Sequence, residues 1–206
     1  MATRVSERLN EGPTGFVYYP KLEIIAALNE GLRFWCLLTL GLEITAGWTP
    51  GATFTHMLTV FSDWIAPLRI MTSAGAIVRH SNLADMAAID PSWIFATGTA
   101  QRYVAIGADF VGVYPAGGTL SVTYARAPVV LAADGDVPEM PIEYHPRLVD
   151  YGIYRMRQVE GGQEFLKSLK YFASFMDGAE HYGNYVRNRN KGADYDTGPL
   201  ELKDGK

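Results

Sequence analysis

The sequence predicts an α+β protein: a small helical bundle, made of an N-terminal helix and a C-terminal helical hairpin, with an inserted antiparallel β-domain. An apolar stretch at helical spacing comes first, over Pro20–Glu43, and short alternating stretches then fill about residues 53–131. Two further helical stretches follow, over Ile142–Val159 and Gly162–Met176. A β-module between helices favours this architecture over a nucleotide-binding α/β fold.

Composition limits the classes of protein to which this chain can belong. The chain has 206 residues, 48% of them hydrophobic and 19% charged, enough to bury one large core or two small ones. A net charge of −4 does not favour tight phosphate binding. The single cysteine, Cys36, excludes an internal disulfide and a cysteine-based zinc site. We expect no secretory signal in residues 1–11, and the apolar stretch Phe34–Leu42 is too short to span a membrane.

Residues 1–19 are predicted to form an N-terminal arm. Glycine and proline break any helix over residues 12–15, while Tyr18 and Tyr19 are apolar enough to dock on a partner. Pro20 then suits the first turn of a helix. This helix is apolar on two faces, which indicates burial on several sides or burial by neighbouring subunits. The first face contains Ile25, Leu28, Leu32 and Trp35, and the second contains Phe34, Leu37, Leu38 and Leu42.

The middle of the chain alternates with a period of two residues, which predicts strands. In Thr53–Val60 the alternation places His56 on the apolar face, where a core histidine is more ordinary than a ligand. Residues 73–75 predict a hairpin turn, and Leu83–Ile89 a short helix. Trp93 should fall into the core of the sheet. Further strands are predicted around Leu68–Ile70, Ile77–Arg79, Tyr103–Ile106, Phe110–Tyr114 and Leu120–Tyr124.

The C-terminal part follows a linker at residues 132–141. Apolar stripes predict two helices separated by Gly161–Gly162, and such a pair should form an antiparallel hairpin closed by the first helix. The expected organisation is an arm at 1–19, a helical domain of 20–46 with 138–186, a β-domain at 50–135 and a tail at 187–206.

No catalytic motif is present, and the sequence predicts no catalytic, metal-binding or cofactor-binding residue. Cys36 lies mid-helix and is expected to be buried. The histidines show no ligand spacing. One cluster of carboxylates surrounds the linker, where turn formation is the ordinary role of Asp134 and Asp136. With Glu139 and Glu143 these residues are the only candidates for a hydrolytic pair.

The tail carries positive charges between two tyrosines. The charges are Arg187, Arg189 and Lys191, and the tyrosines are Tyr185 and Tyr195. Three interpretations stay open: contact with nucleic acid, docking onto another protein, and a solvated tail.

Several short motifs, taken in this order, resemble the head-to-tail connector (adaptor) proteins of tailed bacteriophages. The motifs are Asp90-Pro91-Ser92-Trp93, Tyr103-Val104, Tyr114-Pro115, Leu120–Tyr124 with Arg126-Ala127-Pro128, the hinge Val137–Pro141, Glu143–Tyr151 and Glu160–Phe165. The resemblance covers about Lys21–Arg189.

This resemblance implies a structural virion protein of the neck, assembled in the host cytoplasm. Family members form a ring, usually of twelve copies, between the portal protein and a tail or nozzle protein, and double-stranded DNA passes through the channel. Their C-terminal extension reaches the portal. The resemblance therefore implies an interface with the portal or a neighbouring subunit, here assigned to the tail residues above together with Tyr18 and Tyr19. No cofactor and no membrane is implied.

Two alternatives from other classes remain. A virion-associated peptidoglycan hydrolase would use the linker carboxylates. A carbohydrate-binding β-module would expose Trp or Tyr along a groove of the sheet, whereas we expect Trp64 and Trp93 to be buried.

Overall fold

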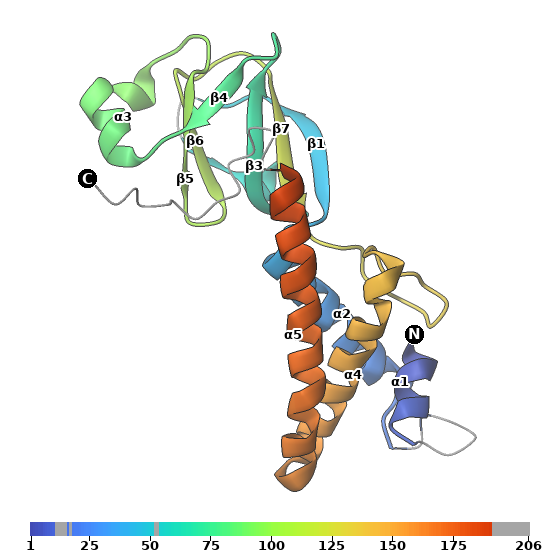
Figure 1. Cartoon of the computed structure of the whole chain (residues 1–206). Helices are drawn as coiled ribbons and strands as arrows, with labels where there is room; N and C mark the ends of the chain where they lie inside the picture. The colour runs from blue at the N-terminus through green and yellow to red at the C-terminus, as the bar shows by residue number, and fades with distance from the viewer. Residues whose placement is uncertain (11–15, 17, 52–53, 191–206) are drawn as a thin grey trace. The chain divides into compact units, whose positions relative to one another are not determined.

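The computed structural model describes residues 1–10, 16, 18–51 and 54–190. Over these residues the chain is mixed α+β, with five α-helices and one curled seven-stranded sheet (Figure 1). It divides into two compact units. The helical unit comprises Met1–Leu42 and Ala127–Tyr185, and the sheet unit comprises Glu43–Arg126 with the chain from Val186 onward.

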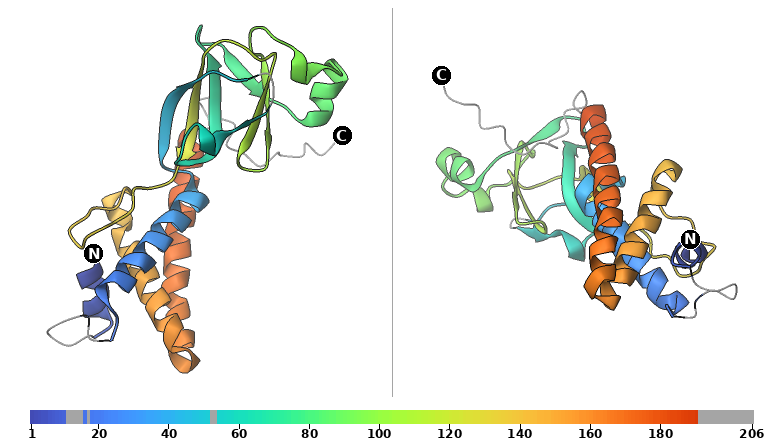
Figure 2. Two further views of the ribbon diagram at one scale, coloured as in Figure 1. Left: turned by 180° about the vertical axis from the view of Figure 1, so that it is seen from behind. Right: turned by 60° about the horizontal axis from the view of Figure 1, so that its bottom comes forward.

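The helical unit is built around three long helices. They are α2 (Lys21–Thr39), α4 (His145–Glu160) and α5 (Gly162–Asn190). The two views of Figure 2 agree that α2 lies along α4 and α5. Aromatic rings join them, with Phe175 of α5 packed on Trp35 and on Tyr151 at centroid distances of 5.7 and 4.8 Å. The apolar stripes of the sequence thus meet in one core.

The predicted helix Pro20–Glu43 is confirmed in its body and ends earlier than expected. Leu40 adopts the left-handed conformation (φ 51°), which stops α2 after Thr39. A Cβ on Gly41 would lie 2.5 Å from the Tyr182 ring, so the chain leaves the helix in close contact with α5. The residues that follow form a strand, β1 (Glu43–Trp48), which the sequence did not predict.

A short helix, α1 (Ala2–Arg8), lies within the stretch predicted as an arm. Ala2 and Val5 are fully buried in the core of the helical unit. Arg8 donates a hydrogen bond of 2.7 Å to Asp150 of α4. This start of the chain is therefore packed, and the pattern was missed because seven residues show too little periodicity to indicate a helix.

The two predicted C-terminal helices are present, and the second is longer than predicted. Gly161 and Gly162 have φ of 68° and 55° and form the corner between α4 and α5. The expected end at Met176 is wrong, because α5 continues to Asn190. Tyr182 and Tyr185 stack in this extension at 6.2 Å.

The sheet unit has the strand order β1-β7-β3-β4-β5-β6-β2. Its strands are β1, β2 (Thr55–His56), β3 (Trp64–Thr72), β4 (Ile77–His80), β5 (Arg102–Ile106), β6 (Phe110–Tyr114) and β7 (Leu120–Arg126). The prediction of an all-antiparallel sheet is wrong at one place, because β4 and β5 pair in parallel. The link between these strands contains α3 (Leu83–Ile89), at the bounds predicted, capped by Asn82.

The prediction from alternation is wrong for most of one strand, Thr53–Val60. The described part of this stretch contains only the two-residue β2 and a 3-10 turn, η1 (Met57–Thr59). Met57 is buried, whereas Leu58 and Val60, which strand alternation would place on the same face as His56, are exposed. His56 is only half buried and packs on Phe110 at the edge, so the prediction of a core histidine is wrong.

The tryptophan predictions are confirmed. Trp64 lies in the main core of the sheet unit and Trp93 in a small cluster with Met86 and Val104. Trp35 and Trp48 are buried as well. None of the four tryptophans therefore offers the exposed platform that a carbohydrate-binding module would need.

Candidate functional site

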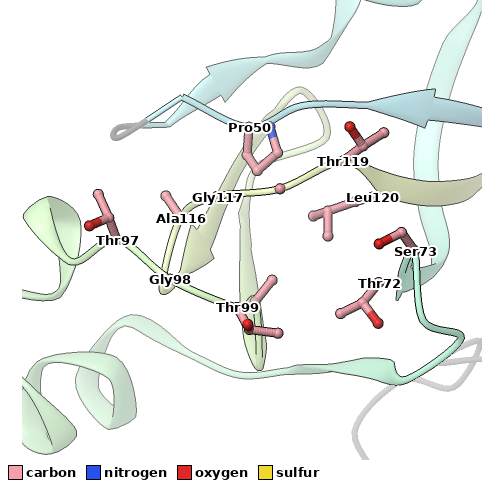
Figure 3. A pocket seen from close by; sticks show the side chains of 12 residues that line it. Pro50, Thr72, Ser73, Thr97, Gly98, Thr99, Ala116, Gly117, Thr119 and Leu120 are labelled. Carbon is pink, nitrogen blue, oxygen red and sulfur yellow. The ribbon is translucent and has the colours of Figure 1, made fainter.

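A hollow of about 640 Å³ opens at one end of the sheet unit. Figure 3 shows its wall of hydroxyl side chains, from the β3–β4 hairpin, the loop before β5 and the loop between β6 and β7. We call it the threonine hollow, after Thr72, Ser73, Thr97, Thr99 and Thr119. Its remaining lining is glycine, alanine, Pro50 and Leu120.

Two glycines allow the loops of the threonine hollow to approach each other. A Cβ on Gly117, whose φ is 152°, would lie 2.9 Å from the carbonyl oxygen of Gly98. Hydrogen bonds from Ala116 to Ala96 and from Gly98 back to Ala116 fix the same approach. The lining residues that the structure describes carry no ionisable group, and their hydroxyl groups can donate and accept hydrogen bonds.

A second hollow, of about 320 Å³, lies between α2 and the segment that follows β7. We call it the valine groove, lined by Asn29, Glu30, Arg33, Pro128, Val129 and Val130. The Asn29 side chain accepts from the backbone N–H of Leu131 at 2.7 Å and donates to its carbonyl at 2.9 Å. This clamp ties the segment to α2, and Val129 and Val130 are exposed at 64% and 68%.

Three carboxylates of the linker, those of Asp134, Asp136 and Glu139, accept hydrogen bonds from backbone N–H groups. Burial acts to raise the pKa of Asp134, but hydrogen bonds from the amino terminus and Thr3 hold that pKa well below its usual value. Asp136 accepts from the N–H groups of Ala133 and Ala132, which also lowers its pKa. Glu139 accepts from Val129 N–H at 2.8 Å.

These contacts shape the loop around the valine groove. A carboxylate engaged by backbone N–H groups is stabilised in its charged form, so it is poorly suited to act as a general acid. Asp136 therefore has the turn-forming role expected of both aspartates, whereas the contacts of Asp134 are with the amino terminus and Thr3, far away in the chain.

The other candidate ligands are separated. Cys36 is buried, as expected. His145 is buried and its Nε2 lies 3.1 Å from the Met140 carbonyl oxygen. Among the described residues no group of three or more His, Cys, Asp or Glu side chains could hold a metal ion. Within the same residues, no helix has the length and apolarity needed to cross a membrane.

The predicted interface residues occupy different places. Tyr19 donates a hydrogen bond to Glu160, at the end of α4, and Tyr18 is highly exposed. Tyr185 lies near the other end of α5, about 35 Å away along the helix at 1.5 Å per residue. The structure therefore does not bring Tyr19 and Tyr185 together.

The positive end of α5, from Val186 onward, belongs to the sheet unit. Arg189 donates to Glu43, the first residue of β1, at 2.7 Å. Arg187 lies on the same last turns with an exposed side chain. Lys191 and Tyr195 lie outside the described residues.

Sequence reasoning missed the valine groove, although two adjacent valines after a predicted strand were a signal. The adjacent exposed valines of the valine groove are an apolar surface of the kind that another protein can cover. The comparison with protein families points to a protein that binds other proteins: the model of the SU10 adaptor protein family matches residues 1–198. The chain belongs to this family of phage head–tail adaptors, which confirms the resemblance found in the sequence.

No curated protein matches the chain. Family membership makes it a structural adaptor of a bacteriophage, associated with portal and tail components at the virion neck.

Proposed function

We propose that this protein forms a ring, of twelve copies, between the portal and the tail of a tailed bacteriophage. The ring extends the channel for double-stranded DNA and provides the surface to which the tail or nozzle protein attaches. The observation that carries the proposal is the family match over residues 1–198, nearly the whole chain. Assembly takes place in the host cytoplasm, and the role is structural and not enzymatic.

The surfaces of the helical unit support assembly. A ring subunit needs two unlike flanks, because each copy meets its neighbours through different faces. The valine groove offers one apolar flank. Leu37 and Leu38 of α2 are also exposed, so part of the second apolar face of this helix is left uncovered within the subunit. A neighbouring copy would remove these side chains from water.

We propose the domains and the interface residues on the basis of the family match. The helical domain of 20–46 with 138–186 carries the β-domain of 50–135, between an arm at 1–19 and a tail at 187–206. The division of the described chain after Leu42 and after Arg126 favours a sheet segment inserted between helical segments, and it counts the start of the chain with the helical unit. The interface with the portal or a neighbour comprises Tyr18, Tyr19, Tyr185, Arg187, Arg189, Lys191 and Tyr195.

The test is electron microscopy of the full chain mixed with the portal of its own phage. We expect a ring of adaptor subunits on the portal, with density for twelve copies. Absence of any complex at high protein concentration, with both proteins folded, would contradict the proposal. The chain alone should be measured in parallel by mass photometry, because a ring that needs the portal as a template leaves the free chain monomeric.

A further inference from the structure

The outer face of α2 carries three exposed residues in one stripe, Leu22, Ala26 and Arg33, which we call the α2 stripe. Their intervals of four and seven residues keep them within about 40° of each other around the helix. Leu22 is 77% exposed. The side chain of Arg33 makes no hydrogen bond or ion pair with any described residue. The α2 stripe is therefore an apolar surface that ends in an unpaired positive charge.

The outer face of α5 repeats this pattern with the opposite charge. Leu169, Ala173 and Glu180, which we call the α5 stripe, are also separated by four and seven residues, and all three are exposed. Within the described part of the chain, the Glu180 carboxylate has no hydrogen-bond or ion-pair partner. Each stripe thus presents a leucine, then an alanine, then a charge, over about 16 Å of helix.

The helices α2 and α5 run in the same direction within the helical unit. Phe34 packs on Phe175 at 6.0 Å between ring centroids, and seven residues later in each segment a Cβ on Gly41 would touch the ring of Tyr182. Rotation about an axis roughly parallel to these helices therefore places α2 of one copy parallel to α5 of the next copy. In that orientation the two stripes match residue for residue.

We propose that the α2 stripe of one copy packs against the α5 stripe of the next copy in the ring. The facing pairs are Leu22 with Leu169, Ala26 with Ala173, and Arg33 with Glu180. The small alanines let the helix axes approach to about 8 Å, the leucines are removed from water, and the two charges form an ion pair. The contact rests on the proposed ring, and it identifies the surfaces through which neighbouring copies meet.

A second copy is the occupant that these stripes favour, because both halves of the match lie in this one chain. The two stripes differ, so the contact is heterologous and can repeat around a ring instead of closing a dimer. Arg33 also lines the valine groove, so a neighbouring α5 on the α2 stripe would lie beside Val129 and Val130. The contact is thus continuous with the groove that we expect assembly to cover.

Two other carboxylates come near the contact in this register. Glu30 and Asp177 each lie three residues before the charge of their stripe, at the same angular offset. Each pairs with an arginine of its own copy, Glu30 with Arg155 at 2.9 Å and Asp177 with Arg147 at 3.5 Å. Because two parallel helices face each other, equal offsets place these carboxylates on opposite sides of the contact, and they do not oppose each other.

Disulfide trapping tests the contact in the ring on the portal. Ala26→Cys with Ala173→Cys, in a Cys36→Ala background, places one thiol in each stripe at the facing alanines. After mild oxidation we expect a ladder of covalently linked subunits on a denaturing gel without reductant. Ala26→Cys alone and Ala173→Cys alone are the matched controls and should give no linked subunits, because identical positions do not meet in a heterologous contact.

Charge reversal tests the ion pair independently. Arg33→Glu and Glu180→Arg should each weaken ring formation on the portal at least about ten-fold, since like charges then face each other in every contact. Mixing the two variants in equal amounts should restore the ring, because alternating copies again pair opposite charges. Arg4→Glu, which changes an exposed arginine of α1, is the control and should form rings like wild type. Circular dichroism checks that each variant is folded.

Three results would overturn the contact while leaving the ring in place. They are a ring that gives no ladder from the double-cysteine protein, linked subunits from either single-cysteine protein, and charge reversals that leave ring formation unchanged. A loss of portal binding by Arg33→Glu that added Glu180→Arg copies do not restore would assign the α2 stripe to the portal and also overturn the contact. If the wild-type chain forms no ring on the portal, the proposed function fails and the contact fails with it.

Discussion

Glycine at position 31 shows how a single residue sets the packing of the helical unit. A Cβ there would lie 2.5 Å from Cδ1 of Tyr151 and 3.0 Å from Cδ1 of Leu148. Tyr151 cannot easily retreat, because it is buried and its hydroxyl donates to Glu30 at 3.0 Å. Its pKa is raised, mainly by burial and then by the bond to Glu30. The absence of a side chain at Gly31 lets α2 and α4 approach.

We expect Gly31→Ala to destabilise the protein, although alanine favours helix. Overpacking should exceed the gain of about 1 kcal/mol in helix propensity and lower the free energy of unfolding by about 1–2 kcal/mol. Denaturant unfolding measures the change. Gly135→Ala is the control, since no atom lies within 4 Å of its added Cβ. A Gly31→Ala protein as stable as wild type would contradict this account.

Tyr124 should make the stability of the protein depend on pH in the alkaline range. Burial, and then its hydrogen bond to Asp63, raises the pKa of Tyr124 to about 12. A raised pKa in the folded state stabilises the protein below the unfolded pKa, about 10, and this contribution disappears as the pH rises to about 12. Wild type should therefore lose stability over that range more steeply than Tyr124→Phe, as measured by unfolding at stepped pH. An identical pH profile for the two proteins would refute the assignment.

At the scale of elements, α1, α4 and α5 are joined through one buried carboxylate. Asp150 accepts from Arg8 of α1 at 2.7 Å and from Ser174 of α5 at 2.6 Å. Arg147, one turn earlier in α4, donates to the same serine. This network explains why a seven-residue helix is held against the bundle.

Asp150→Ala should lower the free energy of unfolding by about 1–3 kcal/mol, because two donors lose their acceptor and Arg8 is only partly screened by water. Asp177→Ala is the matched control: its pair with Arg147 is long, 3.5 Å, and its carboxylate is largely exposed. That variant should change stability by less than about 0.5 kcal/mol in the same denaturation experiment. Equal effects at both sites would show that burial of the network is unimportant.

The corner between α4 and α5 needs glycine. Gly161 has φ 68° and ψ −167°, a region that residues with a Cβ rarely enter. Gly161→Ala should cost about 1–3 kcal/mol of folding free energy and lower the melting temperature. The Gly135→Ala protein again serves as control, and a melting temperature unchanged by Gly161→Ala would disprove the requirement.

The elements differ in how well the sequence predicted them. The α3 helix had a cap, a stop at Asp90-Pro91 and a full turn of pattern, and it was placed correctly. The end of α5 was misplaced because Tyr182, Tyr185 and Val186 continue the apolar stripe more sparsely among polar residues. β1 was missed, and its first residue, Glu43, was placed at the end of a helix, because a short edge strand gives little alternation to detect.

At the scale of the whole molecule, the valine groove is the surface we expect assembly to cover. Val129→Ser with Val130→Ser should weaken binding to the portal or to neighbouring copies at least about ten-fold, because water-exposed apolar side chains would no longer be buried. Its melting temperature should stay at the wild-type value. Val159→Ser, equally exposed near the end of α4, is the control. Full binding by the double variant would exclude the groove from the interface.

The sequence by itself determined the α+β class, the body of each long helix, the glycine corner and most strands, because these follow from local spacing and backbone preference. The order of the short motifs along the chain also indicated the family. Only the tertiary structure decided that β4 and β5 run parallel and that Asn29 binds the segment on which Val129 and Val130 are exposed. Strand register and the clamping of one segment by another depend on contacts between residues far apart in the chain, which no local pattern records.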